Sequence, residues 1–440
     1  MRNSLIATLI ASAFLSLNAG ASDLLQIYKD ALANDAAYGS ARASQRAGQE
    51  KLVQGRSGLL PTLGLSGSDT RTKLDIDPDQ GRSGSFDYNT NSYSLALTQP
   101  LFRWANWQQY EQGKLSVVVS DAQFAQAQQD LIVRVSQAYF DLLASKDILK
   151  TLQAQKVAIS EQLASAKRNF EVGTQTITDS HEAQARFDLI TAQEFAGQGD
   201  VAIKRAALMQ IIGRDVKDEL AGLKKGSQLA APQPENIDKW VESAEQQNFG
   251  VVASQVAVEI AQREISKSRS GHYPTVDLVA SSARTATGGN YNGPTGVIKP
   301  NTIGVQWNIP IFSGFATDSR VKESIALEDK ARNDLESTRR LAAQGARQAY
   351  IGVVAGLAQV KAYEAAEISS RSALDSNMLG YQVGVRINID VLNAQQQLST
   401  TFQNLAKARY DTIMNSLRLK AAAGILKEQD LAEINALLEI

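Results

Sequence analysis

The segment NFEVGTQTITDSHEAQ at residues 169–184 returns as GYQVGVRINIDVLNAQ at residues 380–395. Both contain Val-Gly, a later Asp and then Ala-Gln, each separated from its counterpart by 211 residues (384 − 173 = 211). The same spacing relates two further matches: Gln137-Ala138-Tyr139 with Gln348-Ala349-Tyr350, and Gly213 with Gly424. Five matches at one spacing predict that the chain is a tandem duplication.

The duplication divides the chain into a leader, two copies and a linker. We expect residues 22–225 to form the first copy, 235–440 the second, and 226–234, which are rich in turn formers, the linker. Residues 5–17 are mostly apolar but too short to span a bilayer, and the small-residue site Asn18-Ala19-Gly20-Ala21 follows them. Residues 1–21 are therefore expected to be removed as a signal peptide; an uncleaved anchor is the alternative.

Composition excludes several classes of function. The 45 Lys and Arg balance 46 Asp and Glu without a basic block, so no nucleic-acid partner is expected. Without cysteine, the chain has no disulfide, no thiolate metal site and no residue for a lipoprotein anchor. His181 and His272 are the only histidines, and the common hydrolase, metalloprotease and P-loop motifs are missing. We expect no enzymatic activity, no cofactor and no metal.

Each copy is expected to contribute two strands that alternate large apolar with small or polar residues. The large residues of the clearest strands are Tyr93, Leu95 and Leu97, and Ile303, Val305, Trp307 and Ile309. Residues 62–66 and 275–278 repeat the pattern more weakly. Polar loops at 69–91 and 284–301 are expected to join each pair. Aromatic residues crowd the other strand ends: Phe102, Trp104, Trp107, Tyr273 and Phe312.

This pattern is typical of strands that face lipid on one side and water on the other, with aromatic residues at the membrane interface. Strands of a half-buried soluble sheet are the alternative. Beyond the leader there is no apolar run of about 18 residues, so we expect membrane contact through these strands. Four strands cannot close a barrel, and open edges are not tolerated in lipid. Several chains are therefore expected to build one barrel.

Residues 104–170 contain no proline and only one glycine, Gly113, which predicts one very long helix. Its expected coiled-coil core positions follow steps of four and three: Leu131, Val135, Ala138, Leu142, Ser145, Leu149, Leu152, Lys156, Ile159, Leu163, Ala166 and Phe170. The second copy has smaller residues there: Ala342, Ala346, Ala349, Val353, Gly356 and Val360. The predicted fold is mainly α, with long antiparallel coiled-coil helices and four transmembrane strands per protomer.

The chain resembles the TolC-like outer-membrane efflux and secretion channels along nearly all its mature length. The resemblance is carried by Leu59-Leu60-Pro61-Thr62-Leu63, Gln99-Pro100-Leu101-Phe102 and the two segments quoted first. It implies a homotrimer that forms an α-barrel and β-barrel duct through the outer membrane and periplasm. It also implies contact with outer-membrane lipid, a periplasmic adaptor (membrane fusion protein) and an inner-membrane transporter of the ABC or RND type.

The resemblance also implies two sets of site residues. The tips of the helix hairpins, at Val172, Gly173, Val383 and Gly384, would dock the adaptor. Asp390 and Asn393 lie on one helix face and would form rings at the periplasmic gate. Tyr381 and Arg386 would latch the closed gate against Thr178 and Asp179. The family pattern has a second acidic residue where this chain has Asn393, so a weaker ring charge is expected. Read alone, the glycines are helix caps and Asp390 is part of a solvated face.

Two other classes of function compete with an export duct. A periplasmic coiled-coil scaffold would share the leader and long helices, but it would not need paired amphipathic strands. A hydrolase would need a catalytic constellation that the sequence does not offer. The cargo, whether drug, polypeptide or siderophore, cannot be read from the sequence.

Overall fold

The computed structural model describes residues 23–77, 79, 83–174, 176–216, 219–224, 226–289 and 295–439. The expected signal peptide, residues 1–21, lies outside this part of the chain. The described residues divide into two compact units. We call residues 43–124 and 252–338 the sheet unit, and residues up to 42, 125–251 and from 339 onward the helical unit.

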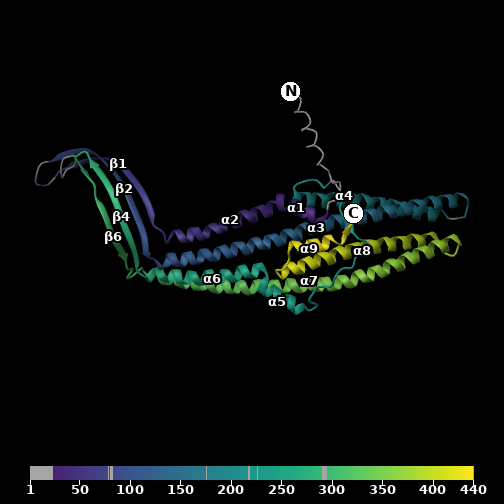
Figure 1. Cartoon of the computed structure of the whole chain (residues 1–440). Helices are drawn as coiled ribbons and strands as arrows, with labels where there is room; N and C mark the ends of the chain where they lie inside the picture. Colours follow the sequence, from purple (N-terminus) through teal and green to yellow (C-terminus); the bar gives the residue numbers. More distant parts are fainter. Residues whose placement is uncertain are drawn as a thin grey trace, which may run out of the picture. The chain divides into compact units, whose positions relative to one another are not determined.

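The sheet unit contains one antiparallel sheet (Figure 1). Its strands are β1 (Thr62–Ile76), β2 (Gly84–Phe102), β4 (Thr275–Thr287), β5 (Gly296–Ile298) and β6 (Asn301–Asn308). β1 pairs with β2, and β2 with β4. β5 pairs with residues 285–287 of β4 and β6 with residues 275–282, so the two share one position at the edge. The sheet is therefore four strands wide, as predicted.

The polar loops expected at 69–91 and 284–301 were largely wrong. β1 and β2 stay paired from Thr62↔Thr98 to Ile76↔Gly84, so most of the first loop is strand. In the second hairpin, pairing continues to Thr287↔Gly296, and residues 290–294 lie outside the described part. The backbone bonds of a ladder do not depend on side-chain polarity, so a strand with both faces wet shows no apolar alternation to detect.

The two faces of the sheet differ in chemistry. One row across the sheet is Leu63, Leu97, Ala280 and Ile303, and the next is Leu65, Leu95, Ser282 and Asn301. We call the face that carries these rows the apolar face. The opposite face carries Thr62, Thr98 and Gly304 in one row and Gly64, Ala96, Ser281 and Thr302 in the next. Large apolar side chains stand in the open on the apolar face, where Leu65 is 76% exposed and Ile303 78%.

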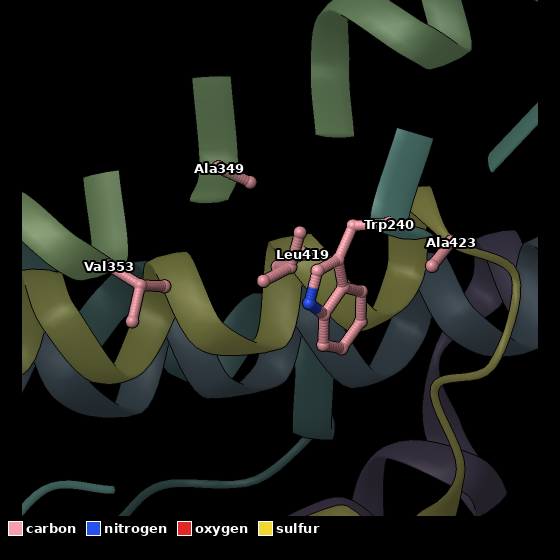
Figure 2. Close-up of a cluster of buried hydrophobic side chains, with 5 residues drawn as sticks. All are labelled: Trp240, Ala349, Val353, Leu419 and Ala423. Atoms are coloured by element: carbon pink, nitrogen blue, oxygen red, sulfur yellow. The ribbon is translucent and has the colours of Figure 1, made fainter. Parts of the chain in front are cut away.

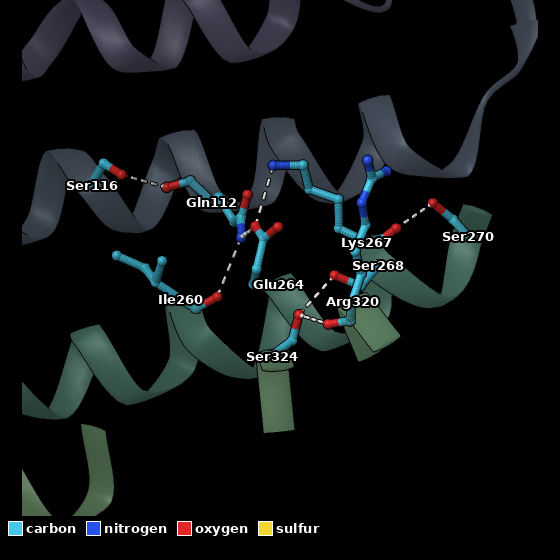
Figure 3. Close-up of polar contacts among 9 residues, drawn as sticks. All are labelled: Gln112, Ser116, Ile260, Glu264, Lys267, Ser268, Ser270, Arg320 and Ser324. Carbon is cyan, nitrogen blue, oxygen red and sulfur yellow. Dashed lines mark hydrogen bonds and ion pairs between the residues drawn. The ribbon is translucent and has the colours of Figure 1, made fainter. Parts of the chain in front are cut away.

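Polar contacts join the helices of the sheet unit (Figure 3). These are parts of α2 (Ala36–Ser57), α3 (Trp104–Glu171), α6 (Phe249–Arg269) and α7 (Ala316–Gln382). The buried Gln112 amide of α3 donates to Glu264 Oε2 of α6 at 2.7 Å, and Lys267 pairs with the same carboxylate at 3.2 Å. Ser268 of α6 and Ser324 of α7 share a hydrogen bond of 2.7 Å. Because buried polar groups need partners, these contacts fix the register of the helices.

The strands are also tied to each other at the helical end of the sheet. Arg103, between β2 and α3, donates two hydrogen bonds of 2.8 and 2.6 Å to the Asp277 carboxylate at the start of β4. Asp277 is buried. A paired fork of this kind holds both partners in one geometry. Next to it, the short η1 turn (Ser270–His272) leads from α6 into β4.

The helical unit is built on two long hairpins, α3 with α4 (Ile177–Ile212) and α7 with α8 (Asn388–Ala422) (Figure 1). α3 runs from Trp104 to Glu171, which confirms the predicted long helix. Most of its expected core positions are buried, although Phe170 is 43% exposed. Shorter elements complete the unit: α1 (Leu24–Asn34), α5 (Ile237–Gln247), α9 (Glu428–Asn435), and the pair β3 (Gly222–Leu223) with β7 (Leu438–Glu439). Among the described helices, none has the length and apolar composition needed to cross a membrane.

Small residues on α7 let neighbouring elements approach it closely. Trp240 of α5 packs in a buried cluster with Ala349 and Val353 of α7 and with Leu419 and Ala423 of α8 (Figure 2). The indole of Trp240 donates to the Pro234 carbonyl at 2.8 Å, which anchors the linker to the unit. A side chain at Gly356 would collide with Thr412 of α8. The small residues that weakened the predicted coiled-coil pattern in the second copy are thus the ones that close packing requires.

Candidate functional site at the hairpin tips

The tip of the first hairpin is a glycine-capped helix end. Gly173 has φ 76°, a left-handed conformation that favours glycine. The Thr174 amide donates to the Asn169 carbonyl at 2.8 Å and the Gly173 amide to Phe170 at 2.9 Å, which is the Schellman arrangement. A Cβ at Gly173 would meet no atom within 4 Å. Next to it, Val172 is 72% exposed.

The tip of the second hairpin has the same construction. Gly384 has φ 79°, and its amide donates to the Tyr381 carbonyl at 3.1 Å. The Val385 amide donates to Gly380 at 2.8 Å, so this cap is again a Schellman arrangement. Val383 is exposed, and a Cβ at Gly384 would also meet nothing. The helix-cap role of both glycines follows from this geometry.

Asp179 and Asp390 hold equivalent positions at the starts of the two return helices. Asp179 Oδ2 accepts from the backbone amide of Thr176 at 3.1 Å, and the Asp179 amide donates back to the Thr176 hydroxyl. Asp390 Oδ2 accepts from the Ile387 amide at 3.5 Å. Both carboxylates lie in the first helical turn, where they bind free amides and interact favourably with the helix dipole. Each aspartate therefore has a structural role beside any role in a gate.

The structure brings three predicted gate residues together. Arg386, Asp390 and Asn393 line one open hollow of about 500 Å³ between α7 and α8. Arg386 Nη1 lies 3.7 Å from Asp390 Oδ2, and both side chains are substantially exposed. Such an exposed pair contributes little to stability. Thr178 is exposed, and Asp179 is bonded within its own turn, so among the described contacts Arg386 pairs with Asp390 rather than with Asp179.

Two tip contacts involve residues that the sequence did not single out. Asn393 Oδ1 accepts from Arg186 of α4 at 3.0 Å, and Asn169 of α3 donates to the Tyr381 hydroxyl at 3.4 Å. The Tyr381 ring also packs against a buried cluster of Leu374, Val391 and Leu398. Asn169 and Tyr381 are separated by almost the repeat spacing of 211 residues. Opposition of equivalent positions in the two copies is the signal that could have pointed to this contact.

Further polar contacts join α3 to α8 along the same hairpins. The buried Gln155 donates to Gln396 and accepts from the buried Ser399 hydroxyl, each at 2.7 Å. The Tyr410 hydroxyl donates to Asp147 Oδ2 at 2.7 Å. Burial raises the pKa of both Asp147 and Tyr410, and the hydrogen bond and charge between them raise that of Tyr410 further. The two hairpins thus meet through satisfied polar pairs as well as apolar packing.

Comparisons with known proteins agree with this architecture. A family model described as outer membrane efflux protein matches residues 27–214 and 240–425, and both matches include a hairpin tip. The chain is 32% identical to the outer membrane protein TolC of Vibrio cholerae, over 97% of this chain and 96% of that protein. The chain belongs to the outer membrane efflux protein family. Its members are transport channels rather than enzymes, and this chain is an outer membrane efflux or secretion channel of the TolC family.

Two further family members place the channel more broadly. The alkaline protease secretion protein AprF of Pseudomonas aeruginosa is 31% identical, over 98% of this chain and 90% of that protein. The solved structure of the Campylobacter jejuni CmeC outer membrane channel superimposes with a TM-score of 0.81 at 17% identity, covering 95% of this chain and 90% of that one. The long helices and the four-stranded antiparallel sheet are therefore the fold of TolC-like channels.

Proposed function

We propose that this chain is one protomer of a homotrimeric, passive export duct that crosses the outer membrane and extends into the periplasm. The sheet carries the proposal. In the described chain, β1 has a strand partner on one side only, and so does the edge formed by β5 and β6. Unpaired backbone groups cost several kcal/mol each in lipid. Three copies would pair every edge and form one twelve-stranded barrel.

Exposed apolar residues on two helices support the same assembly. Leu189, Phe195 and Ile203 of α4 are exposed, and so are Leu341, Ile351 and Ile368 of α7. α3 and α8 are already joined within the chain by the polar pairs described above. Packing of α4 in one copy against α7 in the next would cover both surfaces. Such a head-to-tail contact forms a closed ring when the rotation closes.

The tips are the proposed docking points for a periplasmic adaptor, which would connect the duct to an inner-membrane ABC or RND transporter. Val172, Val383 and Val385 are 72%, 65% and 79% exposed beside the two capping glycines. Apolar side chains gathered at a surface are typical of interaction sites. The adaptor's grip on both tips would couple the transporter to the gate.

The gate is proposed to combine charge and a latch. Asp390 and Asn393 would form rings around the threefold axis, and the ring of carboxylates would attract cations. Arg386 and Tyr381 would hold neighbouring helices closed through Thr178 and Asp179 in the assembled state. Arg386→Ser with Tyr381→Phe should then raise single-channel conductance in planar bilayers. Conductance equal to wild type would contradict the latch.

Polypeptide secretion is the cargo class that the relatives favour. AprF is named for alkaline protease secretion and is 31% identical, whereas the antibiotic efflux pump protein ArpC of Pseudomonas putida is 22% identical over 84% of this chain. Drug efflux is the second candidate, since ArpC shares the family. Crosslinking and identification of the co-purifying transporter would decide between a secretion and a drug transporter.

The organisation of the precursor is part of the proposal. We infer that residues 1–21 are a cleaved signal peptide and that 22–225 and 235–440 are two copies joined by 226–234. The separate family matches at 27–214 and 240–425 support the duplication. N-terminal sequencing of the mature protein should begin at Ser22; a start at Met1 would contradict the cleavage.

The trimer is tested by the mass of the extracted protein. Light scattering of the channel in neutral detergent, corrected for bound detergent, should give three chain masses. A stable, folded monomer would contradict both the barrel and the duct, because its sheet would keep two open edges.

A further inference from the structure

On the apolar face of the sheet lies a hollow of about 290 Å³ with a mixed lining. The row Leu65, Leu95 and Ser282 forms part of it, and Tyr93, Arg284, Lys299 and Asn301 complete its side chains. The Tyr93 ring lies over Gly67, since a Cβ there would come within 3.2 Å of it. An apolar floor thus adjoins two cations and a tyrosine hydroxyl on one face.

The two cations lack acidic partners in the part of the chain that the structure describes. Arg284 and Lys299 are exposed, and no ion pair of the described residues includes them. Arg71 gives the contrast within the sheet. It makes two hydrogen bonds, of 2.9 and 2.6 Å, with the Asp87 carboxylate, and its charge is compensated. The charge of the hollow is free to attract an anion.

The cations also lie about one membrane thickness from the aromatic end of the sheet. Arg284 is eleven positions after Tyr273 (284 − 273 = 11), and Lys299 is ten before Ile309 (309 − 299 = 10). A tilted strand crosses the hydrocarbon core in about 9 to 11 residues. If Tyr273 and Ile309 mark one interface, Arg284 and Lys299 mark the other, next to the hairpin connections. That is the level of lipid headgroups.

We propose that this hollow binds a phosphate-bearing lipid of the outer leaflet. A guanidinium and an ammonium would hold the headgroup phosphate, and an acyl chain would lie on Leu65 and Leu95. Tyr93 suits the boundary, because its ring is apolar and its hydroxyl is wet. The proposal rests on the membrane-spanning role given to the sheet, but it does not depend on the latch or on docking.

Native mass spectrometry of the detergent-extracted channel tests the proposal, with lipid A carrying two phosphates as the probe. Each cation near an anionic lipid contributes roughly fivefold in affinity, so Arg284→Gln with Lys299→Gln should weaken binding roughly thirtyfold. Arg71→Gln is the matched control, since it removes a cation that is already paired, and it should bind as wild type does. Equal binding by the double variant would overturn the proposal.

Two further measurements exclude other readings. Dephosphorylated lipid A should bind much more weakly than the bisphosphate, and excess inorganic phosphate alone should not displace it; either opposite result would overturn the lipid site. If the double variant changes ion selectivity in planar bilayers while lipid A binding is unchanged, the cations face the pore and the proposal is wrong. The same spectra report the oligomer's mass, so failure of the trimer and failure of the lipid site are seen separately.

Discussion

Asp390 combines two properties that substitution can separate. Its carboxylate accepts from the Ile387 amide at the start of α8, and it carries the charge proposed for the gate. Asp179 does the first job at the start of α4, which shows that the cap needs an acceptor there whatever the pore does. An amide keeps an acceptor oxygen, whereas alanine removes both acceptor and charge.

Asp390→Asn should therefore lower cation selectivity while the tip keeps its fold. Asp390→Ala should lower selectivity equally and also destabilise the start of α8 by about 1 kcal/mol, as loss of a cap does. Reversal potentials in a salt gradient across planar bilayers measure the first effect, and thermal unfolding measures the second. Unchanged selectivity in both variants would show that Asp390 does not line the pore.

Asp147 predicts a pH dependence of stability. Burial raises its pKa above 3.8 in the folded chain, despite the Tyr410 hydrogen bond and nearby Lys150. The folded state then holds the proton more tightly than the unfolded state, so stability falls as pH rises from 3.8 through the raised value. Asp147→Asn should remove this fall and raise the unfolding temperature at neutral pH relative to wild type.

Asp35 supplies the control with the opposite sign. Its hydrogen bond with Arg134 lowers its pKa, so its contribution is present above 3.8 and is lost as pH falls through the lowered value. Asp35→Asn should reduce the unfolding temperature most at neutral pH. The two variants should diverge as pH rises, and parallel curves across the acid range would contradict both assignments.

The helices were the most predictable elements. The seam from Leu131 to Ala166 and the lack of proline indicated a helix that the structure ends at Glu171. The polar halves of β1 and β2 could not be found, because a strand with both faces in water has no period-2 signal. The tip contacts Arg186 to Asn393 and Asn169 to Tyr381 could not be found either, since they join residues more than 200 positions apart.

The capping glycines test whether the tips are docking surfaces or only helix ends. Asn tolerates the left-handed conformation, whereas Ala resists it by about 1 kcal/mol. Nothing in the chain obstructs a side chain at Gly173 or Gly384. If the tips dock an adaptor, Gly173→Asn with Gly384→Asn should block export although the caps are kept. Secretion assays in cells with normal channel levels measure this.

The alanine pair is the control for helix capping. Gly173→Ala with Gly384→Ala should lower tip stability more than the asparagine pair but obstruct docking less. Wild-type export in the asparagine pair would show that the tips are helix caps alone.

For the whole molecule, the number of copies follows from edges rather than from any single residue. Both outer edges of the four-strand sheet are unpaired in the described chain, and the apolar face is exposed. The sequence could predict this incompleteness from its four alternating segments. It could not predict which surfaces of the helices meet in the assembly, because α4 and α7 both expose apolar residues that a single chain leaves uncovered.

Disulfide crosslinking between strand edges tests the central claim most directly, because the chain has no cysteine of its own. One cysteine replaces Thr302 in β6 and a second scans Thr62, Gly64, Ser66 and Ser68 in β1, all on the face opposite the apolar one. Oxidation in intact outer membranes should give dimers and closed trimers at one register, and each single-cysteine variant should give no trimer. Monomers alone at every register would contradict the shared barrel and the export duct.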